Sequence, residues 1–145
     1  MIPNIKTAQT DAELLACSDV ILFLRPHLQK ENLLAQLRDM QQEDYRIIYV
    51  TDPEDASKVV AFAGFRHMHK LFSGKTIYID DLACLPAYQG RGYAAKLLDH
   101  VKELAKKEGL QAVQLDSGHG LFPAHRLYHR QGFHISAHHF TQKLA

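Results

Sequence analysis

The segment LPAYQGRGYAAKLL, residues 85–98, decides how the rest of the chain is interpreted. Gly90 and Gly92 flank an arginine immediately before a run of residues with helical spacing. The first N–H groups of a helix have no intrahelical acceptor, and glycine lets an anion approach them without a Cβ clash. A glycine turn that opens a helix is therefore typical of a phosphate-binding site. The alternative is a tight turn at a helix N-terminus that binds no ligand.

The composition is that of one ordinary globular domain. The chain has 145 residues, of which 46% are hydrophobic and 23% are charged, so we expect a single domain over residues 1–145. A net charge of +1 gives no reason to expect nucleic acid or an anionic membrane as a partner. The two cysteines make no disulfide framework, and neither a signal peptide nor an apolar run of about 20 residues occurs. We therefore expect a cytoplasmic protein.

Hydrophobic periodicity predicts the order of the secondary-structure elements. Helices are expected over residues 11–25, with Asp11 as the N-cap, and over residues 28–42, 92–108 and 122–130. Strands are expected over residues 5–10, 45–51, 58–67, 75–85 and 112–116, with two more short strands between 133 and 144. The three consecutive strands between residues 45 and 85 have short connections, which favours an antiparallel meander.

The glycine turn also fits a rival motif, the G-x-G-x-x-G/A fingerprint of dinucleotide-binding folds, over residues 90–95. Three features weigh against it. The tetrapeptide PAYQ separates the glycines from the preceding strand, and that strand ends an antiparallel meander instead of beginning a parallel sheet. Only 29 residues (145 − 116) follow Asp116, which is too few for the second half of such a fold. A nucleotide P-loop motif does not occur.

The third interpretation rests on two motifs. The run QGRGYA, residues 89–94, resembles the Q/R-x-x-G-x-G/A motif of the GNAT superfamily of acetyl-CoA-dependent N-acetyltransferases. It follows LACLP, which is similar to the strand end that precedes this motif in the family. The run AHRLYHRQGF, residues 124–133, resembles the family's second signature, A-x-x-ϕ-Y-x-x-x-G-F, in which ϕ is apolar. The two motifs stand in the family's order and spacing over residues 79–133.

The resemblance implies an α/β (α+β) architecture, the GNAT acyl-CoA N-acyltransferase fold. That fold has a mixed, mostly antiparallel twisted sheet of about six to seven strands flanked by four helices. It implies that the strand at residues 81–85 diverges from the strand at residues 112–116, and that the pantetheine arm of acetyl-CoA pairs with Ala83 and Leu85 in the gap. The Leu85 N–H would then polarise the thioester carbonyl. The acetyl-CoA contacts implied in this way are Ala83, Cys84, Leu85, Gln89, Gly90, Arg91, Gly92, Tyr93, Ala94, Ala95, Lys96, His125 and Tyr128.

The implied reaction is direct transfer of an acetyl group from acetyl-CoA to a primary amine in a ternary complex. Tyr128 matches the family's tyrosine that protonates the leaving sulfur, although it could instead be a core aromatic. Strand alternation would place Asp80 and Asp81 on opposite faces. Asp81 shares a face with Ala83 and Leu85, so it is the favoured general base. Pairing of both acids with Arg or Lys, and proton loss to water, stay open. The base candidates are Asp80, Asp81, His67, His69 and His119.

The remaining features narrow the chemistry without naming the acceptor. Ten histidines invite a metal site, but no acid or cysteine completes a zinc pattern around His125 and His129, so no metal is expected. His125 could be a CoA contact or a solvated helix residue, and Cys84 is expected to be a buried strand residue and not a nucleophile. A small primary amine or polyamine is the first acceptor hypothesis. A protein lysine or N-terminus, or a catalytically silent acetyl-CoA sensor, is the alternative, and a homodimer stays open.

Overall fold

The computed structural model describes residues 4–145, which form two compact units, one ending at Leu115 and the other spanning Asp116–Ala145. The first unit contains one five-stranded sheet in the order β1-β2-β3-β4-β5. Neighbouring strands from β1 to β4 are antiparallel, whereas β4 and β5 are parallel. The strands are β1 (Lys6–Thr7), β2 (Arg46–Asp52), β3 (Asp55–Lys70), β4 (Gly74–Cys84) and β5 (Ala112–Leu115).

The mixed, mostly antiparallel sheet agrees with the predicted fold class, but two predicted strands are wrong. Residues 133–145, all of which the structure describes, contain no strand. Ile135 and Phe140, the apolar residues that suggested strands there, have exposed fractions of 74% and 91%. A strand pattern gives a strand only where a neighbour supplies backbone partners and buries one face. The predicted count of six to seven strands therefore becomes five.

The N-terminal helices differ from the prediction at their caps. Thr10, and not Asp11, is the N-cap of α1 (Asp11–Ala16), because its hydroxyl accepts a hydrogen bond from the Glu13 N–H at 3.1 Å. The Glu13 carboxylate accepts from the Thr10 N–H at 3.0 Å, which completes a capping box. Cys17 ends α1 and precedes α2 (Ser18–Leu24), so the predicted single helix is two helices. The third is α3 (Lys30–Gln41).

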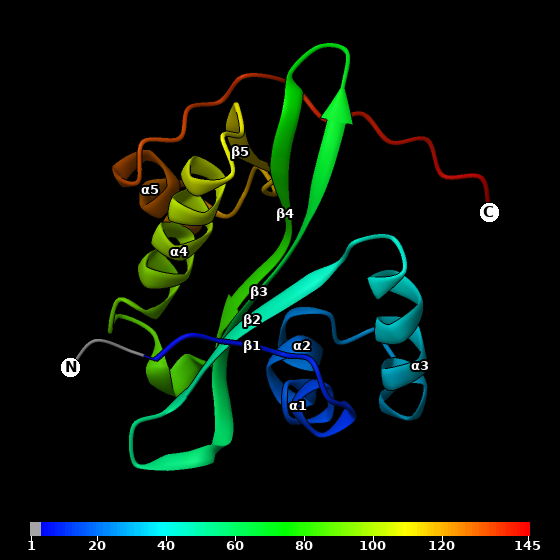
Figure 1. Ribbon diagram of the computed structural model, residues 1–145, viewed down its shortest axis with the longest axis vertical. Helices are drawn as coiled ribbons and strands as arrows, with labels where there is room; N and C mark the ends of the chain where they lie inside the picture. Colours follow the sequence, from blue (N-terminus) through cyan, green and yellow to red (C-terminus); the bar gives the residue numbers. More distant parts are fainter. Residues whose placement is uncertain (1–3) are drawn as a thin grey trace. The chain divides into compact units, whose positions relative to one another are not determined.

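The helices of the first unit cover both faces of the sheet (Figure 1). On one face, α1, α2 and α3 bury Leu14, Val20 and Leu33 against β2 and β3. On the other face lies α4 (Tyr93–Lys107), which buries an apolar stripe that includes Leu97 and Val101. A short 3₁₀ helix (Pro86–Tyr88) links β4 to α4. Among the described residues, no helix is both long and apolar enough to cross a bilayer.

A β-bulge interrupts β4 at Asp80, next to the predicted site residue Asp81. Gly64 of β3 pairs with Asp81, and Phe65 pairs with Ile79, so Asp80 is the extra residue. A bulge breaks the alternation of side chains along a strand and bends it. Parallel pairing between β4 and β5 ends at the next step, with Ile79 opposite Leu115. The last five residues of β4 therefore continue past the end of β5.

The second unit contains α5 (Phe122–Arg130), with the predicted bounds, and is the fifth α-helix where four were expected. Pro123 stands in its first turn, where a missing N–H costs nothing. Its C-terminal end turns through Gly132, which has a φ of +92°. The Phe133 N–H then donates to the Tyr128 carbonyl at 2.9 Å, and the two rings meet edge to face with centroids 5.9 Å apart.

Candidate active site

The glycine turn has the geometry of an anion site. Gly90 and Gly92 have φ values of +78° and +83°, and a Cβ added at either position would meet no atom within 4 Å. Gly92 is the N-cap of α4 and no side chain caps this helix end. The Lys96 N–H makes the first intrahelical bond, to the Gly92 carbonyl at 3.0 Å. The N–H groups of the preceding turn, from Tyr93 to Ala95, are therefore available to an external acceptor.

Side chains around the turn fix its position. The Gln89 amide Nε2 donates to the Cys84 carbonyl at 2.9 Å, which ties the turn to the end of β4. The Arg91 guanidinium lies over the Tyr88 ring, 5.0 Å from its centroid, and the Tyr88 hydroxyl donates to Asp52. Cation–π contact of this kind holds a cation without neutralising it. Arg91 thus keeps a positive charge beside the turn.

The predicted hydrogen-bonding role of Leu85 is wrong. Its N–H donates to the Val60 carbonyl at 2.8 Å, so it points toward β3 and not into the space beyond β5. Because backbone N–H groups alternate along a strand, the Ala83 N–H points the same way. The groups on the open edge of β4 are those of Leu82 and Cys84. Consistent with this, the Cys84 carbonyl faces the turn and accepts from Gln89.

The sequence could not show which edge is free. The prediction that the pantetheine arm pairs with Ala83 and Leu85 rested on the family motif alone. The bulge at Asp80 determines which residues of β4 have their N–H groups toward β3. Leu82 was missed for the same reason. Cys84 lies on the strand as expected, but it is half-buried instead of buried. Burial raises the pKa of its thiol, with Arg91 opposing, so the thiol is neutral at pH 7 and a poor nucleophile.

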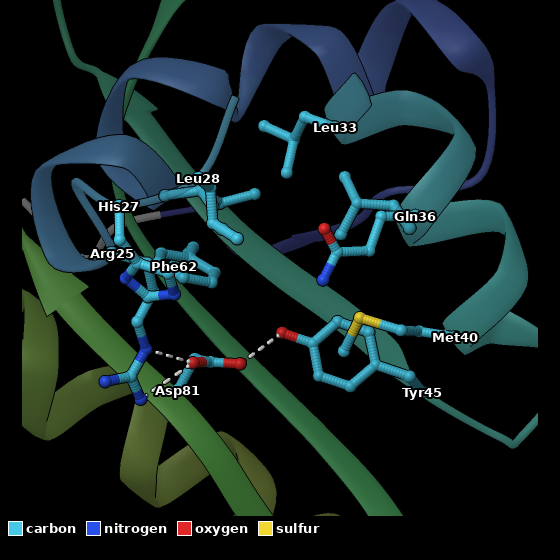
Figure 2. A pocket seen from close by; sticks show the side chains of 11 residues that line it. Arg25, His27, Leu28, Leu33, Gln36, Met40, Tyr45, Phe62 and Asp81 are labelled. Carbon is cyan, nitrogen blue, oxygen red and sulfur yellow. Dashed lines mark hydrogen bonds and ion pairs between the residues drawn. The ribbon is translucent and has the colours of Figure 1, made fainter. Parts of the chain in front are cut away.

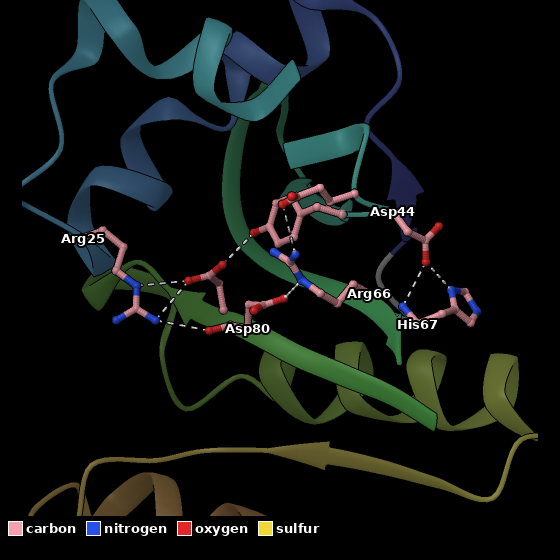
Figure 3. A network of polar contacts seen from close by, with 8 residues as sticks. Arg25, Asp44, Arg66, His67 and Asp80 are labelled. Carbon is pink, nitrogen blue, oxygen red and sulfur yellow. Dashed lines mark hydrogen bonds and ion pairs between the residues drawn. The ribbon is translucent and has the colours of Figure 1, made fainter. Parts of the chain in front are cut away.

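Asp80 and Asp81 belong to one connected network of polar contacts and do not lie on opposite faces of the strand (Figure 3). The Arg25 Nε donates to Asp81 Oδ1 at 3.0 Å, and the Tyr45 hydroxyl donates to Asp81 Oδ2 at 2.7 Å. The Arg66 Nε donates to Asp80 Oδ2 at 2.9 Å, and the Arg66 guanidinium lies 5.4 Å from the centroid of the Tyr45 ring. The prediction of opposite faces is wrong because the bulge breaks the alternation. Both acids pair with arginine, which was one of the alternatives.

The Tyr45 side chain passes over Gly64 of β3, which has no side chain, to reach Asp81. A Cβ added to Gly64 would lie 1.7 Å from the Tyr45 hydroxyl oxygen. Burial, with the Asp81 carboxylate as the next cause, raises the pKa of Tyr45 well above its usual value. The phenol is therefore a permanent hydrogen-bond donor, and Asp81 is held as an acceptor.

A cavity of about 350 Å³ opens on the α1–α3 face at Asp81 (Figure 2). Its inner wall is buried and mostly apolar, whereas its mouth carries three exposed polar residues, Arg25, His27 and Gln36. The Asp81 side chain is 15% exposed and the Arg25 side chain is 44% exposed. The buried wall consists of Ile21, Leu33, Leu37, Tyr45 and Phe62.

His67 is held away from this cavity by two acids. Its Nδ1 lies 2.7 Å from Asp44 Oδ2, and its Nε2 lies 2.8 Å from Glu108 Oε2. Burial acts against Asp44, but hydrogen bonds from the His67 N–H and ring outweigh it and lower the pKa of Asp44. His69 is exposed and pairs with Lys75 across the β3–β4 hairpin. Neither histidine lines the cavity.

The second unit holds the other predicted residues. Burial raises the pKa of Tyr128, so its phenol is protonated at neutral pH and can donate a proton. His125 Nε2 lies 2.8 Å from the Gly118 carbonyl, which gives this ring a structural partner. His119 is exposed in the loop before α5. Within residues 4–145, no group of three or more His, Cys, Asp or Glu side chains could hold a metal ion.

Comparison with known proteins points to one family. Residues 13–133 match the model of the Acetyltransferase (GNAT) family. An uncharacterised N-acetyltransferase of Bacillus subtilis (strain 168), YhdJ, is 30% identical over 120 residues, which is 82% of this chain and 83% of that protein. A thialysine N-epsilon-acetyltransferase of Mus musculus is 23% identical over 115 residues, which is 68% of this chain and 67% of that protein.

Solved structures share the fold. An aminoglycoside N-acetyltransferase in complex with CoA superimposes with a TM-score of 0.82 at 15% identity, covering 99% of this chain and 97% of the other. A GNAT family acetyltransferase of Staphylococcus aureus gives a TM-score of 0.79 at 18% identity, covering 99% of this chain and 100% of the other.

Proposed function

Because this chain belongs to the GNAT acetyltransferase family and is an acetyltransferase enzyme, we propose that it transfers the acetyl group of acetyl-CoA directly to a primary amine of a small molecule. The observation that carries the proposal is the open edge of β4 beside the uncapped glycine turn. That edge offers backbone hydrogen bonds to an extended arm, and the turn offers N–H groups to a phosphate at the end of that arm.

The residues present fit CoA. The family includes a protein solved in complex with CoA, which supports acetyl-CoA as the co-substrate. In our proposal the α4 N-terminus, from Gly90 to Ala95, holds the pyrophosphate, and Arg91 and Lys96 add positive charge nearby. Leu82 and Cys84 bind the pantetheine arm through their backbone groups, in place of Ala83 and Leu85. An N–H on this edge is also placed to stabilise negative charge on the thioester oxygen.

Acetyl-CoA supplies an activated acetyl thioester. The protein positions the amine beside that thioester and donates a proton to the leaving sulfur. The amine nitrogen bonds to the acetyl carbon as the carbon–sulfur bond breaks. Tyr128 donates its phenolic proton to the leaving sulfur. A primary amine is an ammonium group at neutral pH, so its nitrogen releases one proton to solvent before it attacks and a second as the amide forms. No acyl-enzyme forms, which agrees with the neutral thiol of Cys84. Tyr128 is then reprotonated from water.

A small amine is the acceptor class that the observations favour. The thialysine and aminoglycoside acetyltransferases named above act, by their names, on small amine-bearing molecules. The cavity at Asp81 is closed by a buried apolar wall, which suits a small molecule better than an extended peptide. Asp81 faces the cavity as its acid, so we assign it to binding the amine.

The test is release of the CoA thiol from acetyl-CoA across a panel of small amines, polyamines and lysine peptides, with products identified by mass spectrometry. We expect amine-dependent thiol release. Tyr128→Phe should lower kcat by roughly 10²–10⁴-fold, the usual worth of a general acid, while acetyl-CoA still binds. Thiol release that no amine accelerates would overturn the proposal.

A further inference from the structure

The charged residues of the cavity at Asp81 lie on one side of it, and this restricts which amines it can bind. Among the described residues that line it, Asp81 is the only acid, and Arg25 and His27 stand on the same side of it (Figure 2). Asp81 already accepts two hydrogen bonds, one from Arg25 and one from Tyr45. The cavity can therefore compensate one ammonium group and no more.

The two partners of Asp81 differ in how readily they move. Tyr45 is 3% exposed, and its ring is fixed over Gly64. The Arg25 side chain is 44% exposed and follows the C-terminal end of α2, and its Nη2 also donates to the Asp80 carbonyl at 3.2 Å. Because exposed ion pairs contribute little, its guanidinium can leave Asp81 Oδ1 for water while the side chain stays at the cavity mouth. An incoming ammonium group can thus replace Arg25 at Asp81 Oδ1 while Tyr45 keeps Oδ2 in place.

The remainder of the cavity favours an apolar body. Leu33, Leu37 and Phe62 are each no more than 4% exposed, and Leu28 and Met40 add apolar surface. Gln36 points from α3 into the space and is the polar group on that side (Figure 2). A second or third ammonium group would meet this wall without a carboxylate, and burial of an unpaired charge is strongly unfavourable.

We propose that this cavity takes a primary amine carried on a single apolar chain, with the ammonium group at Asp81 and the chain along Leu33, Leu37 and Phe62. The inference rests on the proposed acetyl transfer for its place in the reaction. Asp81 lies in the stretch of β4 that extends beyond β5, so a bound amine lies beside the edge assigned to acetyl-CoA. Polyamines and lysine peptides are excluded as preferred acceptors.

Binding can be tested without acetyl transfer. Calorimetric titration of propylamine, butylamine, pentylamine and hexylamine into the protein, without acetyl-CoA, should give affinities that rise with length. Each buried methylene is worth ~0.8 kcal/mol, which is about fourfold in Kd, until the cavity is full. Spermidine should bind more weakly than hexylamine. Affinities that do not depend on chain length, or tighter binding of spermidine, would overturn the inference.

Variants locate the site. Gln36→Phe places a ring in the cavity, so it should weaken hexylamine binding about tenfold or more. Ala35→Phe adds the same ring to α3 at an exposed position that does not line the cavity, and it should leave the affinity unchanged. Arg25→Gln removes the competing cation and should tighten binding a few-fold. Unchanged or weaker hexylamine binding in Arg25→Gln would show that Arg25 does not compete with the ammonium group for Asp81, and would contradict the proposal.

Activity separates this inference from the proposed function. If acetyl transfer occurs and Gln36→Phe raises the KM for hexylamine but not for acetyl-CoA, both stand. If transfer occurs to spermidine and Gln36→Phe does not affect it, the proposed function stands and the inference fails. If hexylamine binds in the cavity but is never acetylated, the inference about binding stands and the proposed function fails.

Discussion

Gly64 is the residue on which the geometry around Asp81 depends most directly. The Tyr45 ring crosses β3 at this position, and a Cβ there would lie 1.7 Å from the phenolic oxygen. In Gly64→Ala the ring must move, so its 2.7 Å hydrogen bond to Asp81 is lost. We expect a loss of about 1–3 kcal/mol in the free energy of unfolding, as for other overpacked sites. The KM for the amine should rise more than the KM for acetyl-CoA.

A matched control for this substitution lies in the second unit. Gly120→Ala also adds one methyl group, but its Cβ would meet nothing within 4 Å and its backbone carries no positive φ. Denaturant unfolding and steady-state kinetics of both variants check the prediction. Equal unfolding free energies for Gly64→Ala and the wild type would show that Tyr45 does not need the space.

At the scale of single residues, the sequence indicated which residues lie near the site better than it indicated which way their side chains and N–H groups point. The sequence favours Asp81 as the general base, and Asp81 lines the cavity, which leaves that role a prediction. Its partners Arg25 and Tyr45 are separated from it by 56 and 36 positions and carry no motif, so pattern reasoning could not pair them. Leu85 was assigned a free N–H, yet that N–H bonds to Val60. One extra residue in a strand reverses which edge each later N–H group faces. A bulge leaves little trace in the amino-acid composition, so the sequence does not reveal it.

Among the elements, the N-terminus of α4 gives a prediction with an internal control. Gly92 and Gly109 stand just outside the two ends of this helix with φ values of +83° and +70°. Alanine at either position should cost about 1–2 kcal/mol of stability, because L residues are strained in the left-handed region. Gly92→Ala alone should also weaken acetyl-CoA binding, by roughly tenfold, since its Cβ and altered φ disturb the N–H groups that bind phosphate.

Calorimetric titration with acetyl-CoA separates the two effects of these alanine substitutions. Equal affinities in Gly92→Ala and Gly109→Ala would mean that the glycine turn does not bind the pyrophosphate. Because both variants carry the same backbone strain, a general loss of stability could not explain a difference between them.

The capping box of α1 predicts a pH dependence of stability. Hydrogen bonds from the Thr10 N–H, the Gln9 N–H and the Tyr49 hydroxyl lower the pKa of Glu13 from 4.5 to about 2. A carboxyl whose pKa is lower in the folded state stabilises the fold above its unfolded pKa, and this contribution is lost as the pH falls through the folded value. Glu13→Gln should therefore lower Tm at pH 7. The difference from wild type should shrink between pH 4.5 and pH 2.

Thermal unfolding of both proteins from pH 7 down to pH 2 measures this difference. A Tm difference that stays constant over this range would contradict the assignment of the shift to Glu13. Glu31→Gln, an exposed acid in the first turn of α3, controls for the loss of one surface charge.

Element types followed from the sequence wherever one periodicity extended over a whole segment. The apolar stripe of α4 and the β-branched and aromatic run of β2 predicted those elements to within a few residues. Prediction failed where the outcome depended on a neighbour. Residues 133–144 have strand-like composition but no partner strand, and the break at Cys17 has no glycine or proline to mark it.

For the whole molecule, direct acetyl transfer requires that both substrates be bound before any bond changes. The first unit supplies the open β4 edge and the cavity, and the neutral thiol of Cys84 makes a covalent acetyl-enzyme unsuitable. The fold could be predicted from two motifs, because they are specific in order and spacing. The proposed acceptor could not, because the cavity at Asp81 is built from residues scattered between Ile21 and Asp81.

The most direct test is the initial rate of CoA thiol release with acetyl-CoA and hexylamine both varied. Direct transfer in a ternary complex predicts double-reciprocal lines that intersect, with no thiol burst when the amine is omitted. Parallel lines, together with a burst of one thiol per enzyme before amine is added, would show an acetyl-enzyme and contradict the account.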